Sequence, residues 1–289
     1  MIIVRLMGGL GNQMFQYALA RHLSMTNNCE LKLDIAYFSK KHRRPYGLGH
    51  FNIIENFASK KELFLFKNIN NLSKKPWSYI GKLLEIKPGY IEEKIFGFNQ
   101  SILELSGDIY LDGYWQSERF FLPIKNALLG EFSLKNNPSN EFLKLEELAK
   151  TTDSVAVHVR RGDYVSNERI FNVHGVCPPD YFRTAISEVM NRVANPQFFI
   201  FSDEIKWVKA NLDLPSTSVF VSGNRSIKDH EELALMSKCR HNIISNSSFS
   251  WWGAWLNKNA EKIVIAPKKW FSDTTLDSKD IIPEQWMKI

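Results

Sequence analysis

The feature of this chain that most restricts its fold is the alternation of strand-like and helix-like segments in its second half. Apolar runs typical of strands occupy residues 155–160, 197–201, 218–221, 242–245 and 262–266. Between them, helical spacing is clearest after Asp180, where the apolar positions are Phe182, Ala185, Ile186, Val189, Met190 and Val193. Strands that alternate with helices predict a parallel sheet with right-handed crossovers. We therefore expect this half to be an α/β domain of the Rossmann type.

The first half opens with a strand, a glycine turn and a helix. The strand is expected at residues 2–6 and the turn at 8–11, and Asn12 is the expected N-cap of the helix. Such a turn presents backbone N–H groups to an anion. The dinucleotide-binding pattern is incomplete, because Met14 stands where its third glycine or alanine belongs. Asp34 imitates the ribose-binding acid, so an NAD-dependent oxidoreductase is one alternative.

Further along, the residues predict a strand within 108–115 and a helix over 117–129. The best linker candidate is the stretch 136–140, where Asn, Pro and Ser gather between two ordered segments. A chain of 289 residues has room for two domains. We therefore expect an N-terminal domain at 1–140 and a C-terminal domain at 141–289.

The composition, with 44% hydrophobic and 24% charged residues, is typical of a globular protein. The net charge of +6 and the basic run at 40–44 fit an anionic ligand or peripheral contact with a membrane surface, whereas a dispersed excess serves solubility. No signal peptide and no membrane span is evident, so we expect a cytoplasmic protein. Three distant cysteines indicate neither a disulfide framework nor a Cys-rich metal site.

Charged residues follow the strand at 155–160. Its period-two alternation breaks at Gly162, so Arg160, Arg161 and Asp163 lie where the chain leaves the sheet. Ligands of open α/β sheets bind outside the carboxyl ends of the strands, and guanidinium groups suit phosphate oxygens. These residues predict an anion site, with a solvated Arg–Asp pair as the alternative. His158 points to the same side as Arg160 and is either part of the site or a core histidine.

Two more polar stretches end predicted strands, at 202–204 and at 245–248. The second begins a helix, and helix starts rich in Ser and Asn bind phosphate or serve as ordinary caps. The chain has no Asp-x-Asp triplet and no P-loop. If a nucleoside diphosphate is the leaving group, Arg160 and the helix N–H groups would neutralise its charge in place of a metal.

Three segments together resemble the alpha-1,2-fucosyltransferases of glycosyltransferase family 11: residues 8–16 (GGLGNQMFQ), 158–164 (HVRRGDY) and 235–255, which ends in NSSFSWWGAW. The resemblance implies the GT-B architecture, with two Rossmann-like domains facing a cleft. It also implies transfer of L-fucose from GDP-fucose to O2 of a terminal β-galactoside, with inversion and without a metal or other cofactor. Surface polysaccharide or lipopolysaccharide assembly would be the fitting context. No nucleic acid partner is expected.

The resemblance assigns roles to individual residues. Arg160 is similar to the arginine that clamps the β-phosphate, with Arg161 beside it in the same motif. Glu232 stands where related enzymes place an acid against the N–H groups of guanine; its alternative role is a first-turn helix glutamate favoured by the macrodipole. Asn12 and Gln13 are similar to the loop of the N-terminal, acceptor-side domain that faces the donor. The remaining segment expected to hold the diphosphate is Asn246, Ser247, Ser248 and Phe249.

An inverting transfer needs a group that accepts the proton of the acceptor hydroxyl, or a leaving phosphate that accepts it. Asp163 is the preferred candidate, provided that it is not simply paired with Arg161. Glu168 is the second, because some related fucosyltransferases carry a glutamate at this distance, and His174 is the third. A carbohydrate-binding module remains an alternative for the whole chain, since it would use the eight tryptophans and need no diphosphate site.

Overall fold

The computed structural model describes residues 1–39, 44–72, 89–223 and 226–289. The chain divides into two compact units, Met1–Phe132 and Ser133–Ile289. The division falls a few residues before the stretch 136–140. The basic run at 40–44 lies, apart from Arg44, outside the described residues.

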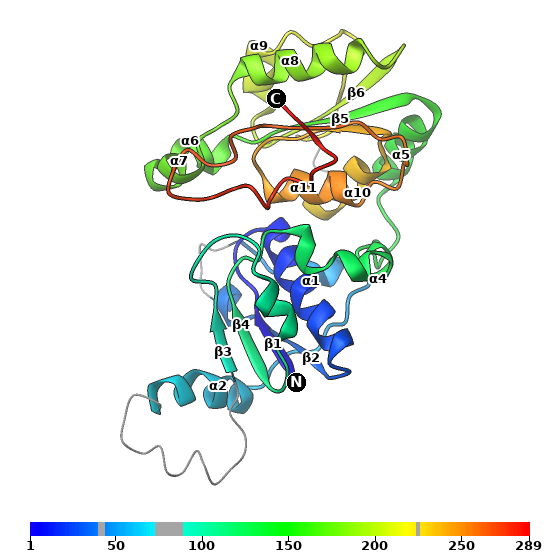
Figure 1. The fold of residues 1–289 in the computed structure, drawn as a ribbon. Coiled ribbons are helices and arrows are strands. Elements are labelled where there is room, and N and C mark those ends of the chain that lie inside the picture. The colour runs from blue at the N-terminus through cyan, green and yellow to red at the C-terminus, as the bar shows by residue number, and fades with distance from the viewer. Residues whose placement is uncertain (40–43, 73–88, 224–225) are drawn as a thin grey trace. The chain divides into compact units, whose positions relative to one another are not determined.

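The first unit is built on a four-stranded, wholly parallel sheet with the order β2–β1–β4–β3 (Figure 1). Its strands are β1 (Ile2–Arg5), β2 (Leu31–Asp34), β3 (Gly89–Glu92) and β4 (Ile109–Asp112). Its α-helices are α1 (Leu10–Thr26), α2 (Lys60–Leu72) and α4 (Lys125–Glu131). Short 3₁₀ helices lie at Ala36–Ser39, Leu48–His50, Gln100–Glu104, Glu118–Phe120 and Leu122–Ile124.

The single helix predicted over 117–129 is wrong. Two 3₁₀ turns occupy its first part, and only α4 is a regular α-helix. Pro123 explains the break, because proline has no backbone N–H to donate and its ring clashes with the preceding turn of an α-helix. The apolar spacing that suggested a helix instead buries Phe120 and Phe121, which both have 0% exposure.

The second unit contains a six-stranded parallel sheet with the order β10–β9–β8–β5–β6–β7. Its strands are β5 (Asp153–Val159), β6 (Pro196–Ser202), β7 (Val219–Phe220), β8 (His241–Ile243), β9 (Val264–Ala266) and β10 (Met287–Lys288). Its helices are α5 (Asn140–Thr151), α6 (Gly162–Ser166), α7 (Glu168–His174), α8 (Pro179–Met190), α9 (Ile205–Asn211), α10 (Asp229–Lys238) and α11 (Ser248–Trp255). Both faces are covered: α8 and α9 lie on one and α5, α10 and α11 on the other (Figure 1).

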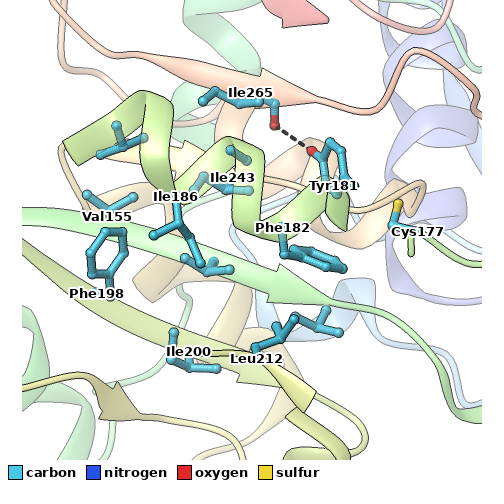
Figure 2. Packing of buried hydrophobic residues seen from close by; sticks show 14 of the residues in the cluster. Val155, Cys177, Tyr181, Phe182, Ile186, Phe198, Ile200, Leu212, Ile243 and Ile265 are labelled. Atoms are coloured by element: carbon cyan, nitrogen blue, oxygen red, sulfur yellow. Dashed lines mark hydrogen bonds between the residues drawn. The ribbon is translucent and has the colours of Figure 1, made fainter. Parts of the chain in front are cut away.

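The alternation in β5 explains how the sheet is buried on both sides. Val155 and Val157 pack with Phe182 of α8 in one apolar cluster (Figure 2), while Ala156 joins the cluster on the opposite face. A parallel strand covered by helices on both faces needs such continuous apolarity. The Tyr181 hydroxyl lies 2.5 Å from the carbonyl oxygen of Ile244 and 3.2 Å from that of Ile265, which fixes α8 against the ends of β8 and β9.

Candidate functional site

The strand order places a ligand site at one point of the second sheet. From β5 the chain continues to β6 on one side, whereas β8 lies on the other side of β5. The direction of winding therefore reverses between β5 and β8, and open α/β sheets bind ligands outside the carboxyl ends of the strands at such a switch point. Arg160 directly follows β5 and Ser245 lies two residues beyond β8, so two of the predicted polar stretches meet at this edge.

Arg160 is held by two carboxylates. One guanidinium nitrogen donates to Asp163 of α6, and the other lies 2.8 Å from Asp203 Oδ2, just beyond β6. The guanidinium carbon is 5.3 Å from the centre of the Tyr164 ring, a distance at which a cation is attracted by the ring face. The Arg160 side chain keeps 18% exposure. It is therefore fixed in place and still reachable by a ligand.

Arg161 turns away from Arg160 and makes a different set of contacts. Its Nε donates to Glu204 at 3.1 Å, and its guanidinium carbon lies 3.7 Å from the centre of the Trp207 ring. Ion pairing and stacking on an indole ring hold the Arg161 guanidinium in place against α9. The neighbouring arginines thus differ in role: the geometry makes Arg160 the one suited to an anion and gives Arg161 a part in joining β5 to α9.

The arginine cluster carries more negative than positive charge. Three carboxylates, those of Asp163, Asp203 and Glu204, surround two guanidinium groups. An anionic ligand at Arg160 would compete with the Asp163 and Asp203 carboxylates for the same cation. Asp203 is additionally fixed by the backbone N–H of Arg161 at 2.9 Å. Asp163 is the more exposed of the two partners of Arg160, at 36% against 26% for Asp203, which makes it the exchangeable one.

The second component of the edge is the start of α11. Ser247 is its N-cap, with extended φ and ψ of −136° and 126°, and its side chain makes no capping hydrogen bond. The first N–H groups of a helix have no intrahelical acceptor and favour an anion. Ser248 and Phe249 are the first two residues of this helix, and both are half-buried. The predicted diphosphate-binding segment is therefore a helix N-terminus next to β5.

His158 and Asn246 are buried next to this edge of the sheet. His158 is 5% exposed, and its Nδ1 lies 2.9 Å from Ser245 Oγ. Burial, together with the charge of Arg160, lowers the pKa of His158 to about 3, so the ring is neutral. Asn246 is 2% exposed and donates to the carbonyl oxygens of His174 and Trp270. Because both side chains already have hydrogen-bond partners inside the protein, their role is to shape this edge of the sheet.

Glu232 of α10 lies at the ends of β6 and β7. The Ser222 hydroxyl donates to Glu232 Oε2 at 2.9 Å and accepts the backbone N–H of Ser202 at 2.9 Å. Burial is the main cause that raises the pKa of Glu232 to about 7, and Asp229 and Asp203 add to it. Half-buried carboxyls with such a shift are typical of functional sites. The carboxyl is therefore poised to accept hydrogen bonds from a ligand near the arginine cluster.

Glu168 and His174, the other two candidates for the base, mark the two ends of α7. Glu168 is exposed in the first turn, where a carboxylate complements the helix dipole. His174 is half-buried at the last turn, and its ring stacks on Tyr164 with 4.8 Å between centres and 15° between planes. Sequence reasoning gave Tyr164 no role in the site, because only the folding of α6 against α7 brings the two rings together.

In the first unit, the glycine turn leads into α1, but the prediction that Asn12 is the N-cap is wrong: Gly9 has the extended backbone of the N-cap, the helix begins at Leu10, and Asn12 lies in its first turn. Asn12 accepts a hydrogen bond from Gln116 at 2.8 Å. Gln13 is fully buried, and its amide is bonded to three backbone groups, those of Gly8, Pro45 and Gly47. Gln13 thus fixes the shape of this loop. Asp34 is 1% exposed and accepts the Tyr110 hydroxyl at 2.6 Å, so it is engaged inside the unit and does not lie open to a ribose.

A doubly wound sheet with an arginine and a helix start at its switch point defines the class of α/β proteins that bind phosphate-bearing ligands at the strand ends. The model of Glycosyl transferase family 11 matches residues 1–289, and the chain belongs to this family.

Two relatives and one solved structure illustrate the match. The chain is 38% identical to an alpha-1,2-colitosyltransferase of Escherichia coli, over 100% of this chain and 98% of the relative. It is 31% identical to the galactoside alpha-(1,2)-fucosyltransferase 1 of Leontopithecus chrysomelas, over 50% of this chain and 42% of the relative. The crystal structure of POFUT1 in complex with GDP has a TM-score of 0.51 at 12% identity, covering 90% of this chain and 96% of that one. The predicted α/β fold class of GT-B type is confirmed.

Within the described parts of the chain, no helix is both long and apolar enough to span a bilayer. Among the same residues, no three His, Cys, Asp or Glu side chains are grouped so that they could hold a metal ion. Metal independence itself stays a prediction.

Proposed function

We propose that this chain transfers L-fucose from GDP-fucose to O2 of a terminal β-galactoside, with inversion and without a metal or other cofactor. The observation that carries the proposal is the meeting of Arg160 and the start of α11 at the switch point between β5 and β8. A guanidinium and a helix N-terminus together provide fixed positive charge for a leaving diphosphate. Membership of Glycosyl transferase family 11 supplies the reaction class.

The proposed step breaks the bond between C1 of the sugar and the β-phosphate oxygen and forms a bond from C1 to the acceptor O2. Arg160 and the N–H groups of α11 stabilise the charge that develops on the β-phosphate. The diphosphate takes the place of Asp163 at Arg160, and the released Asp163 carboxylate accepts the proton of the acceptor hydroxyl. In this scheme donor binding makes the base available. Glu232 accepts the N–H groups of guanine on the other side of the cluster.

A second candidate function differs from the first in the sugar that is transferred. The relative that matches the whole chain at 38% identity is an alpha-1,2-colitosyltransferase. Colitose is fucose without its 3-hydroxyl group, so the same nucleotide site could serve both sugars. A side-by-side measurement with GDP-fucose and GDP-colitose decides between them: a kcat/KM ratio well above one for GDP-fucose supports the proposal, and the reverse ratio assigns the colitosyl activity.

The two alternatives considered from sequence find little support in the geometry. The buried tryptophans include Trp115, Trp251, Trp252, Trp255, Trp270 and Trp286. Trp207 is half-buried beneath Arg161. Core tryptophans do not form the open platform that a carbohydrate-binding module uses. An oxidoreductase would need the Asp34 carboxylate, which is already bonded to Tyr110.

The decisive experiment replaces Arg160. We expect Arg160→Ala to reduce transfer by at least about a hundredfold, since it removes the only side-chain cation proposed to touch the leaving group. Product mass and linkage from GDP-fucose and a panel of galactosides provide the readout. Arg183→Ala is the matched control, because Arg183 is exposed on α8 and pairs with Asp180 at the surface. Equal activity of the Arg160 variant and the control would overturn the mechanism.

A further inference from the structure

The rings of Tyr164, His174 and Phe271 are in contact one after another beside Arg160, and we call this group the aromatic column. Arg160 lies over the Tyr164 ring, Tyr164 stacks on His174, and the Phe271 ring is tilted by 48° against His174 with ring centres 5.5 Å apart. Since each member touches the next, the column fixes the distance between the imidazole and the guanidinium. It brings His174 to the same edge as the proposed diphosphate site.

The backbone around His174 is fixed as firmly as its ring. Gly175 caps α7 with φ +61°, and a Cβ there would lie 2.1 Å from Ser272 Oγ. The N–H groups of Ser272 and Asp273 both donate to the carbonyl oxygen of Val173. The His174 carbonyl accepts the Asn246 amide at 2.8 Å. A residue held at both its main chain and its ring is placed for a defined contact.

The imidazole nitrogens of His174 have no hydrogen-bond partner among the residues that the structure describes, and Nδ1 is buried. Orphaned buried N–H donors are rarer than under-satisfied buried acceptors, so the favoured neutral tautomer carries its proton on Nε2 and leaves the buried Nδ1 as an unprotonated nitrogen. Burial is the main cause that lowers the pKa of His174, while Asp163 raises it and Arg160 lowers it. The ring is therefore neutral near physiological pH, with one donor, at Nε2.

We infer that His174 is a ligand-binding residue that donates a hydrogen bond from Nε2 to a phosphate oxygen of the nucleoside diphosphate held by Arg160. The inference rests on the proposed function and deepens it, since it adds a neutral donor to the cation and the helix start. It also removes His174 from the candidates for the base. Accepting a proton at Nε2 would require the opposite tautomer, with an N–H buried at Nδ1.

The test distinguishes the effect of the Nε2 hydrogen-bond donor from the effect of ring packing at His174. His174→Phe keeps an aromatic ring against Tyr164 and removes the donor, whereas His174→Gln removes the ring and places an amide N–H near the position of Nε2. We expect GDP to bind His174→Phe about tenfold more weakly than the native chain and His174→Gln within about threefold of it. Guanosine, which has no phosphate, should bind all three proteins equally. Calorimetry with GDP and with guanosine gives both affinities.

Native GDP affinity in His174→Phe would overturn the inference while leaving the proposed function intact. Equal losses of GDP and guanosine, with a lower melting temperature, would show that His174 only packs the column and would also overturn it. If His174→Phe does not fold, His174→Asn replaces it: its amide reaches the place of Nδ1, so GDP affinity equal to or above that of His174→Gln would count against the Nε2 donor. If the native chain binds guanosine but not GDP, the proposed function itself fails.

Discussion

Arg160 is shared between a fixed carboxylate and an exchangeable one. Asp203 is anchored by the backbone of Arg161, whereas Asp163 belongs to the short helix α6 and is more exposed. A ligand phosphate and the Asp163 carboxylate compete for the same guanidinium donors, so donor binding and release of the proposed base are one event.

We expect Asp163→Asn to bind GDP more tightly than the native chain and yet to transfer fucose more slowly, by on the order of a hundredfold. The amide no longer competes for Arg160 as an anion, and it cannot accept the proton of the acceptor. Calorimetry with GDP and the turnover at saturating substrates measure the two effects. Weaker GDP binding together with normal turnover would contradict both roles.

Glu232 predicts a dependence on pH. Burial raises its folded pKa to about 7 from the usual 4.5, so the carboxylate forms as the pH rises through about 7. Because the proposed contact with the guanine N–H groups needs the ionised form, GDP affinity should rise from about pH 6 to about pH 8. The contribution of Glu232 to folding stability should be fully present below about pH 4.5 and be lost as the pH rises to about 7, because over this range the folded protein keeps a proton that the unfolded chain has released. Glu232→Gln should flatten both trends, and unchanged profiles would remove the guanine contact.

At the scale of the elements, the joint between β5 and α6 depends on Gly162. A Cβ at this position would lie 2.4 Å from Asp203 Oδ2 and 3.0 Å from Asp203 Cγ. Asp203 joins the end of β6 to Arg160 and to the backbone of Arg161. The close approach of Gly162 thus lets two neighbouring strand ends share one carboxylate.

Gly162→Ala should displace Asp203, lower the free energy of unfolding by about 1–3 kcal/mol and weaken GDP binding. The matched control is Gly130→Ala in α4, where a Cβ would meet nothing within 4 Å. The control should be neutral or stabilising by up to about 1 kcal/mol. Chemical denaturation and GDP titration of both variants are the measurements, and equal stability of the two variants would show that Asp203 adapts freely.

The sequence predicted the elements that carry continuous apolar patterns and missed those that depend on local caps. The strands β5, β6, β8 and β9 are apolar enough to stand out, and the helical spacing after Asp180 corresponds to α8. The short helices α6 and α7 were not predicted, because Asn167, the N-cap of α7, organises them through side-chain hydrogen bonds that apolar spacing does not register.

The sequence also predicted part of the candidate site. Arg160, Asp163 and the start of α11 follow from strand ends, and Asp203 lies in a polar stretch that marks the end of β6. The different contacts of Arg160 and Arg161 were not predictable, because those of Arg161 depend on Trp207 in α9. Tyr164 and Ser222 were missed because their partners are distant in the chain.

For the whole molecule, the arrangement of charges within the second unit predicts that no divalent cation is needed. The leaving diphosphate would meet Arg160, the N–H groups of α11 and the neutral donor of His174, all built into one unit. Transfer by the full chain should therefore be unaffected by EDTA. A native chain assayed after chelation and again after Mg²⁺ or Mn²⁺ is restored gives the answer, and recovery only with the cation would contradict the charge arrangement.

The hairpin of α6 and α7 interrupts the path from β5 to α8 without taking part in the hydrogen-bonded ladder of the sheet. Substitutions at the outer positions of this hairpin should therefore leave the parallel sheet intact. The same hairpin carries Asp163, Tyr164 and His174, so its conformation can change the proposed ligand site without a change in the sheet.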